Sequence, residues 1–366
     1  MTKDKIIISG LLILLAVFSI CLLQPQIAGD SFHYTDSIEV LKTGIVPEEF
    51  MPMMIVSTYL GLQSIMFFDL FTNSFKVSWL LLNGIFYVFM GLSAYLLIKE
   101  MFGDKLTAFL GALFLVVNYA VVVFGLAYMM DMGGWFFYMV SLYFSYKYFK
   151  NDNESDKWLY LSSVLVGLGG LYKEYAFVAY VVIFGIIIFR DWTDWLKILK
   201  KVIITGCISF GPFLLLNIYG FLKFDYTYLD WFLEQKKYSF QNKTLEFIKS
   251  FGSIFNFGWL LFFPGFYLLL NRTKNMIKSK IINRDLIFIW LVIFSCISVL
   301  LWPVVTRVLF ITMPAAILVS SLFIKKLSRN LRLCITLPIL ALYMISSYFM
   351  DSFILDFVNL PLGFLE

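Results

Sequence analysis

Residues 6–23 read IIISGLLILLAVFSICLL, an uninterrupted apolar run near the start of the chain. A helix needs about 20 apolar residues to cross roughly 30 Å of hydrocarbon, so this run predicts a membrane span. A short charged head, Met1 to Lys5, precedes it, and no small-residue cleavage site comes before Gln24-Pro25-Gln26. We therefore expect a retained span and not a removed signal peptide.

The same pattern recurs along all 366 residues, of which 61% are hydrophobic and 14% charged, with a mean hydropathy of +0.85. These values indicate an all-α polytopic membrane protein with about eleven transmembrane helices. The predicted spans are 6–23, 77–98, 107–124, 132–149, 158–172, 175–190, 202–222, 251–270, 285–302, 308–325 and 332–349. Because the longest segments between spans are 24–76 and 223–250, we expect one membrane-embedded domain over 1–366 and no soluble C-terminal domain.

A further apolar run, 51–71, is as long as a span, but charge placement argues that it lies along the membrane surface. With this run outside the membrane, the predicted cytoplasmic segments hold 20 of the 29 Lys and Arg residues, as the positive-inside rule requires. Asp69 within the run and Pro52 near its start also favour an interfacial helix. We therefore predict a cytoplasmic N-terminus, a first outer loop at 24–76 with interfacial helices, and a multi-pass protein of the cell membrane.

The remaining composition excludes other classes of protein. The four cysteines, Cys21, Cys207, Cys296 and Cys334, all fall in predicted spans, so neither a disulfide framework nor a zinc site is expected. The net charge of +5 comes from basic residues spread over six short cytoplasmic loops, which reports orientation and argues against nucleic-acid binding. The lipid bilayer is the first expected partner.

Several polar and charged residues that the positive-inside rule does not explain lie on the predicted outer side. The first outer loop reads GDSFHYTDSIEVLKTG over 29–44, and a helix there would place Asp30, His33 and Tyr34 close together with Asp36. A carboxylate at such a boundary suits a general base. The alternatives are that these acids are ordinary solvated loop residues, and that His33 is a structural hydrogen-bonding group or a metal ligand with Asp30 or Asp36.

Two further outer turns carry charge. Asp131 is the only charged residue between Lys105 and Lys147, and it is either functional or an N-cap of the following span. Lys173, beside Glu174, and Arg307 are cations on the side that the charge rule depletes of them. Arginine can fork onto phosphate oxygens and lysine adds a point charge, which suggests a phosphorylated ligand. Snorkelling anchors, or a local Lys173–Glu174 ion pair, are the alternatives.

The order of these features resembles the GT-C superfamily of membrane glycosyltransferases, in particular the branch of the dolichyl-phosphate-mannose protein mannosyltransferases and the aminoarabinose transferases. The resemblance covers about the first 190 residues and the region of Arg307. Its elements are the Gly-Asp-x-x-x-Tyr loop at 29–34, the interfacial helix, Asp131, the Gly-Leu-x-x-Leu-x-Lys at 167–173, and Arg307 followed by Met313-Pro314.

The resemblance implies transfer of a sugar from a polyprenyl-phosphate carrier to a lipid, glycan or protein acceptor at the outer face. Asp30 would match the catalytic Asp of the first loop and Asp131 the second acid. Lys173 and Arg307 would match the basic groups near the carrier phosphate, with Tyr34 and Glu174 beside them as substrate-binding residues. We expect the base on one side of the substrate and the two cations that bind the phosphate, which we call the phosphate clamp, on the other. Metal dependence varies in the superfamily, and no cofactor is evident from the residues.

Two departures from the pattern and three alternative functions remain. The Lys-Pro-Pro of the aminoarabinose branch is replaced by Phe50-Met51-Pro52-Met53, so Lys42 or Lys76 would have to supply that phosphate contact. An appended domain that would recognise a protein acceptor is not expected. The alternatives are a lipid-linked sugar flippase or other transporter, a polysaccharide polymerase, and a partner-binding subunit.

Overall fold

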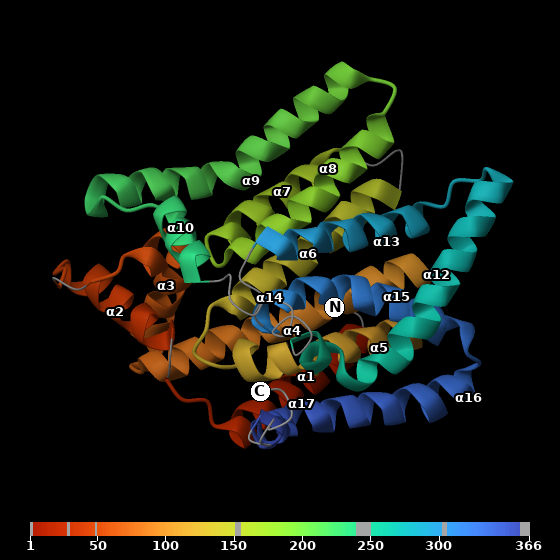
Figure 1. Cartoon of the computed structure of the whole chain (residues 1–366), viewed down its shortest axis with the longest axis horizontal. Coiled ribbons are helices and arrows are strands. Elements are labelled where there is room, and N and C mark those ends of the chain that lie inside the picture. The colour runs from red at the N-terminus through yellow and green to blue at the C-terminus, as the bar shows by residue number, and fades with distance from the viewer. Residues whose placement is uncertain are drawn as a thin grey trace, which may run out of the picture.

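The computed structural model describes residues 3–27, 30–47, 50–150, 155–238, 250–301 and 306–358, and within these ranges the protein is helical and contains no strand (Figure 1). The all-α prediction is confirmed. The elements, in which η marks a 3₁₀ or π turn, are α1 (Lys3–Leu23), α2 (Asp30–Thr43), α3 (Met53–Thr72), α4 (Phe75–Phe102), α5 (Lys105–Val116), η1 (Val121–Gly125), α6 (Asp131–Lys150), α7 (Lys157–Gly170), η2 (Glu174–Phe177), α8 (Val178–Asp191), α9 (Trp195–Phe224), α10 (Tyr228–Tyr238), η3 (Asn256–Gly258), α12 (Trp259–Ser279), α13 (Arg284–Ser295), η4 (Cys296–Leu301), α14 (Thr306–Leu309), η5 (Phe310–Thr312), α15 (Met313–Lys326), α16 (Arg329–Leu331), η6 (Arg332–Thr336) and α17 (Leu337–Val358).

The charge rule assigned six segments to the cytoplasm: the N-terminal head, 99–106, 147–157, 190–201, 271–285 and 325–332. Their described residues are connected to one another at one end of the helix bundle, which we call the basic end. Side chains join them in pairs, so the loops form one connected network. The contacts are the ion pairs Asp4–Lys105 (2.6 Å), Glu100–Lys150 (3.2 Å), Asp104–Arg332 (2.7 Å) and Asp156–Lys201 (3.0 Å), and hydrogen bonds from Lys325 to the Phe102 carbonyl (2.7 Å), from Arg284 to the Lys150 carbonyl (3.0 Å) and from Arg190 to the Tyr148 carbonyl (2.6 Å).

The segments assigned to the outside meet at the opposite end, which we call the site end. The Ser31 hydroxyl donates to the Tyr128 carbonyl at 2.8 Å, and the Trp79 indole donates to the Met129 carbonyl at 3.1 Å. In Figure 1, α2, α3 and α10 lie together at the left of the view, while α16 lies at the right. The chain therefore separates its basic loops from its polar outer loops by the length of the bundle.

Helix α3 corresponds to the predicted interfacial helix at 51–71, and it lies across the site end. Near its start, Val56 packs on Gly220 of α9, and at its middle the Leu60 amide donates to the Leu171 carbonyl at 3.0 Å. At its last residue, the Thr72 hydroxyl lies 2.6 Å from that of Ser78 in α4. Since all three contacts are with segments of the site end, α3 stays at that end and does not traverse the bundle.

The predicted number of eleven spans is not confirmed. By length and composition, seven helices among the described residues could cross a membrane, and α3 is one of them. Of the five predicted spans outside this set, four correspond to helices of only 12 or 14 residues, namely α5, α7, α8 and α13. The apolar sequence continues past α5 and α13 and begins before α8, but there the backbone changes to η1, η4 and η2. Such irregular backbone is tolerated at membrane depth where protein buries it.

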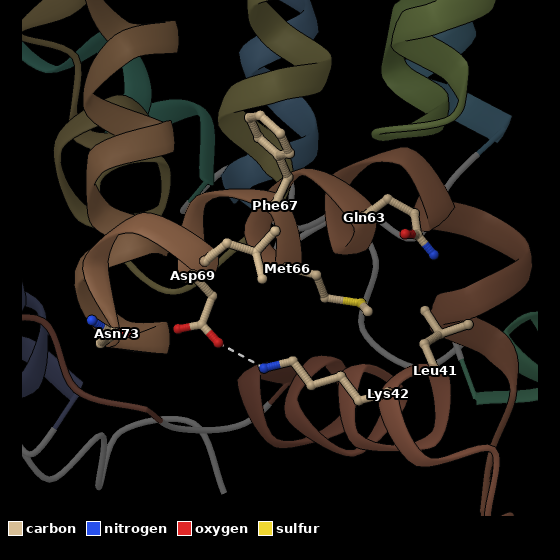
Figure 2. A pocket seen from close by; sticks show the side chains of 8 residues that line it. Leu41, Lys42, Gln63, Met66, Phe67, Asp69 and Asn73 are labelled. Atoms are coloured by element: carbon tan, nitrogen blue, oxygen red, sulfur yellow. Dashed lines mark hydrogen bonds and ion pairs between the residues drawn. The ribbon is translucent and has the colours of Figure 1, made fainter.

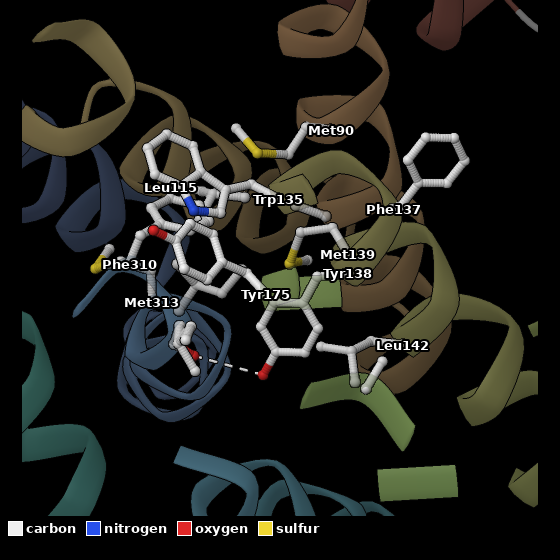
Figure 3. Close-up of a cluster of buried hydrophobic side chains, with 14 of the residues drawn as sticks. Met90, Leu115, Trp135, Phe137, Tyr138, Met139, Leu142, Tyr175, Phe310 and Met313 are labelled. Atoms are coloured by element: carbon white, nitrogen blue, oxygen red, sulfur yellow. Dashed lines mark hydrogen bonds between the residues drawn. The ribbon is translucent and has the colours of Figure 1, made fainter. Parts of the chain in front are cut away.

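The core contains many aromatic side chains and extends through the bundle to the site end. Trp79, Trp135 and Phe114 are fully buried, and Trp135 packs on Phe310 with their ring centroids 4.3 Å apart. Figure 3 shows Trp135, Tyr175 and Phe310 in one cluster from α6, η2 and η5. This packing joins the first half of the chain to the segment that carries Arg307. The four cysteines, Cys21, Cys207, Cys296 and Cys334, have free thiols.

Candidate active site

Four segments that are distant in sequence bring the predicted site residues together at the site end. Asp30 is the first residue of α2 and Asp131 the first residue of α6. Lys173 and Glu174 lie at the turn from α7 into η2, and Arg307 lies in α14. Each charged group therefore occurs where a helix begins or ends, next to the core but outside its apolar layers. We call these five residues the charged cluster.

Arg307 is the centre of the charged cluster. Its Nη2 lies 2.5 Å from Asp30 Oδ2, and its Nη1 lies 3.8 Å from Asp131 Oδ2. The Sδ atom of Met129 lies 3.7 Å from the same Nη1. Asp30 and Arg307, which were expected on opposite sides of a substrate, thus form an ion pair with each other.

The two carboxylates beside Arg307 differ in exposure. The Asp30 side chain is 35% exposed, whereas that of Asp131 is 0% exposed. Burial by itself raises the pKa of Asp30, but the charge and hydrogen bond of Arg307 outweigh it, with smaller contributions from Lys173 and His33. The pKa of Asp30 therefore lies below its ordinary value, and the group is ionised at neutral pH.

Neither carboxylate oxygen of Asp131 has a hydrogen-bond partner in the protein. The alternative of an N-cap is therefore excluded, since a capping side chain accepts a backbone N–H. A buried polar group without a partner costs about 1–3 kcal/mol, and more if it is charged. A buried carboxyl group without hydrogen-bond partners is a feature of a binding or catalytic site more than of a stable core.

Glycines bring the Lys173 turn against the start of α6. A Cβ atom at Gly133 would lie 2.5 Å from the Tyr172 ring, and one at Gly134 would lie 2.7 Å from the Lys173 Cβ. The turn itself is closed by the Lys173 amide, which donates to the Gly169 carbonyl at 2.8 Å. Gly133 and Gly134 thus allow the turn that carries Lys173 to pack directly on the first turn of α6, which carries Asp131.

Lys173 and Glu174 form the predicted local ion pair, with Lys173 Nζ 3.8 Å from Glu174 Oε2. Both side chains are buried, at 6% and 4% exposure. Burial lowers the pKa of Lys173, but Glu174, Tyr34 and Asp131 raise it by more, so its pKa lies above the ordinary value and the ammonium remains charged. Because Glu174 Oε2 has no hydrogen-bond partner, the pair is loose and Lys173 retains donors for a further anion.

Tyr34 lies one turn after Asp30 and is completely buried, edge-on to Trp79 with ring centroids 5.6 Å apart. Burial raises the pKa of Tyr34 to about 12, so the phenol is neutral. Its hydroxyl has no hydrogen-bond partner in the protein. His33 and Asp36, by contrast, are exposed.

Sequence reasoning missed Trp135. This residue is fully buried, and its indole Nε1 has no hydrogen-bond partner. It lies four residues after Asp131 in α6, so the two side chains share a helix face. The i, i+4 relation to Asp131 was the available signal, but apolar residues surround Trp135 in the sequence and suggest ordinary core.

The predicted replacements for the Lys-Pro-Pro contact lie away from the charged cluster. Lys42 forms an ion pair with Asp69 at 2.7 Å in a groove of about 860 Å³ between α2 and α3, as Figure 2 shows. Lys42 lies twelve positions after Asp30 in α2, which is about 18 Å along a helix. Lys76 is exposed at the start of α4. Among the described residues, no group of three or more His, Cys, Asp or Glu side chains could hold a metal ion.

Comparison with known proteins shows which folds this chain resembles. Residues 62–216 match the dolichyl-phosphate-mannose-protein mannosyltransferase family. The crystal structure of ArnT from Cupriavidus metallidurans bound to undecaprenyl phosphate is similar with a TM-score of 0.64 over 88% of this chain, at 13% sequence identity. The chain has a GT-C fold. The predicted resemblance to this superfamily is confirmed, although the family match starts after the Asp30 loop and extends beyond residue 190.

A second solved structure is also similar. The archaeal oligosaccharyltransferase AglB from Archaeoglobus fulgidus, in complex with an inhibitory peptide and a dolichol-phosphate, gives a TM-score of 0.59 over 95% of this chain, at 12% identity. The chain spans 60% of the ArnT chain and 55% of the AglB chain. None of the curated proteins matches by sequence.

Proposed function

We propose that this protein is an integral membrane glycosyltransferase that moves a sugar from a polyprenyl-phosphate carrier to a lipid, glycan or protein acceptor at the outer membrane face. The observation that carries the proposal is the cluster of Asp30, Arg307 and Asp131 at the site end of a GT-C fold. Both solved structures contain a polyprenyl or dolichol phosphate, as their descriptions state. The basic end, with its Lys and Arg network, would face the cytoplasm.

In the proposed reaction, an acceptor hydroxyl attacks C1 of the sugar. Its oxygen forms a bond to C1, its proton passes to the Asp30 carboxylate, and the bond from C1 to the phosphate oxygen breaks with its electron pair on the phosphate. Arg307 and Lys173 would stabilise the negative charge that grows on this leaving group. Asp131, fixed and buried beside Arg307, would position the guanidinium.

The first prediction tests the enzyme and its base together. The purified protein in proteoliposomes should transfer sugar from a polyprenyl-phosphate-linked donor. Asp30→Asn, which is nearly isosteric but cannot accept the proton, should lower turnover by about 10²-fold or more, the usual weight of a general base. Asp36→Asn and His33→Ala, on the exposed face of the same helix, are the matched controls and should change turnover far less.

Near wild-type turnover by the Asp30→Asn protein would remove this residue as the base and move the role to Asp131. Transport of the lipid-linked sugar across the vesicle bilayer without any transfer would instead support the transporter alternative.

A further inference from the structure

The two groups to which the proposed function gives opposite roles are in contact. Arg307 Nη2 and Asp30 Oδ2 are 2.5 Å apart, a charge-assisted hydrogen bond. In this arrangement the Asp30 carboxylate is not free to accept a proton from an acceptor, and the Arg307 guanidinium is not free to bind a phosphate. A phosphate that forks onto the guanidinium with two parallel hydrogen bonds needs the edge that Asp30 occupies or approaches.

The charge count of the cluster makes this conflict stronger. Asp30, Asp131 and Glu174 are three carboxylates, while Lys173 and Arg307 are two cations. A carrier phosphate would add more negative charge to a site that already has an excess of it. Coulomb repulsion in a partly buried site costs several kcal/mol at short range, so an anion that enters must separate from the carboxylates.

Of the two carboxylates beside Arg307, Asp30 is the one that can leave. Asp131 is completely buried at the start of α6, where the Asn83 amide holds the preceding turn by the carbonyls of Ala127 and Met129 at 2.7 and 3.0 Å. Asp30 is 35% exposed and lies at the first residue of α2, open to water. A change of its side-chain rotamer moves the carboxylate without moving the core.

Building on the proposed function, we propose that the carrier phosphate displaces Asp30 from Arg307, so that donor binding seats the phosphate and frees the base in one exchange. The base would then be available to an acceptor only when a donor is present. Asp30 and the phosphate compete for one guanidinium, and Asp131 keeps that guanidinium in place during the exchange.

The electrostatics of Asp30 fit this exchange. The groups that face it are Arg307 from α14, Lys173 from the turn before η2, and His33 from its own helix. Arg307 contributes most to keeping the pKa of Asp30 low, whereas burial raises it. Once Arg307 is bound to phosphate, burial and a new neighbouring anion would raise the pKa of Asp30. A carboxylate with a higher pKa is a stronger base.

The second prediction follows from competition and is measured as binding, without turnover. Asp30→Asn should bind a polyprenyl phosphate about tenfold more tightly than the wild-type protein, because the competing carboxylate is gone. Dissociation constants in nanodiscs would be compared for polyprenyl phosphate, uncharged polyprenol and inorganic phosphate, which separates the contribution of the lipid from that of the anion. Asp36→Asn, the same charge change on the exposed face of α2, should leave the affinity within about twofold.

The exchange also predicts a pH dependence. At low pH Asp30 becomes protonated in the wild-type protein and no longer competes, so its affinity should approach that of Asp30→Asn. The gap between the two proteins should be widest above the pKa of Asp30 and should close as pH falls through it. Protonation of the phosphate itself, with a second pKa near 6, affects both proteins alike and cancels in the comparison.

Equal or weaker polyprenyl phosphate binding by Asp30→Asn, in a protein with an unchanged melting temperature, would overturn the exchange and make Asp30 a positioning residue for Arg307. Asp30→Glu, which keeps the charge, guards against a folding artefact and should show no tenfold gain. The proposed function fails separately, if no form of the protein binds polyprenyl phosphate or transfers sugar.

Discussion

Arg307 lies between the carboxylates of Asp30 and Asp131, which differ in burial. This difference determines what each carboxylate can do in the charged cluster. Asp131 is completely buried, and its carboxylate oxygens lack hydrogen-bond partners. Asp30 is accessible to water and in direct contact with the guanidinium. Near them, Tyr34 and Trp135 leave a buried hydroxyl and a buried indole N–H unpartnered.

The third prediction concerns the two cations. Arg307→Ala should weaken donor binding by about tenfold to a hundredfold, since a bidentate charge-assisted pair contributes roughly 1.5 to 3 kcal/mol. Arg307→Lys should recover only part of the affinity, because an ammonium cannot fork. Lys173→Ala should show a smaller loss, because Glu174 shares its charge at 3.8 Å.

Apparent donor and acceptor affinities for each of these variants are the measurement. If Arg307→Ala changes only the use of acceptor and leaves donor affinity unaltered, Arg307 is an acceptor contact or a span anchor and not the phosphate clamp.

Among the elements, the start of α6 and the turn before η2 determine the geometry of the site. Gly133 and Gly134 allow Tyr172 and Lys173 to approach the α6 backbone more closely than any residue with a Cβ would permit. In the same region, η1 and η2 interrupt apolar runs that would otherwise continue as plain helix. The irregular backbone lies near the charged cluster, where it places charged side chains at a helix end.

The fourth prediction tests this close approach. In Gly134→Ala, the new methyl group would lie 2.7 Å from Lys173 Cβ and 3.3 Å from the Lys173 carbonyl oxygen, so the turn must move away from α6. Donor affinity should fall by about tenfold, and the melting temperature should fall with it. Gly84→Ala in α4 is the matched control, since nothing lies within 4 Å of its new methyl group.

Gly84→Ala should be neutral or stabilise the protein by up to about 1 kcal/mol through helix propensity. Wild-type donor affinity in Gly134→Ala would mean that the position of Lys173 does not matter for the carrier phosphate.

Over the whole molecule, polar groups divide into two ends with different roles. The basic end is a network of satisfied ion pairs; buried Lys201, for example, contacts Asp191 at 2.9 Å and the Tyr148 hydroxyl at 2.7 Å. The site end instead carries buried carboxylate oxygens without a hydrogen-bond partner, those of Asp131 and Glu174, whereas the unpartnered buried groups near the basic end are neutral hydroxyls such as those of Tyr95 and Thr107. This contrast argues that the basic end stabilises the bundle and that the site end binds a ligand.

The fifth prediction concerns orientation. In a protein without its native cysteines, Ser74→Cys and Ser155→Cys should react with a membrane-impermeant reagent from opposite sides of the membrane, Ser74→Cys from outside. Reaction of both from the outside would contradict the topology and with it the outer-face site.

Hydropathy and charge were sufficient for the helical membrane class, for the grouping of six basic segments at one end, and for α3 as a helix across the other. These properties follow from additive preferences of single residues and short segments for lipid, water or the cytoplasmic side. Sequence order and residue type likewise pointed to Asp30, Asp131, Lys173, Glu174 and Arg307 as one cluster.

Three features required the folded chain. The Asp30–Arg307 contact joins residues 277 positions apart, and its existence depends on how α2 and α14 pack. The lack of hydrogen-bond partners for Asp131 depends on all the described residues packed around it, none of which places a donor within reach of its carboxylate. The short helices α5, α7, α8 and α13 arise where irregular turns replace helix, and hydropathy registers only that those turns are apolar. Contacts and missing contacts are properties of pairs of distant residues, so no local pattern in the chain contains them.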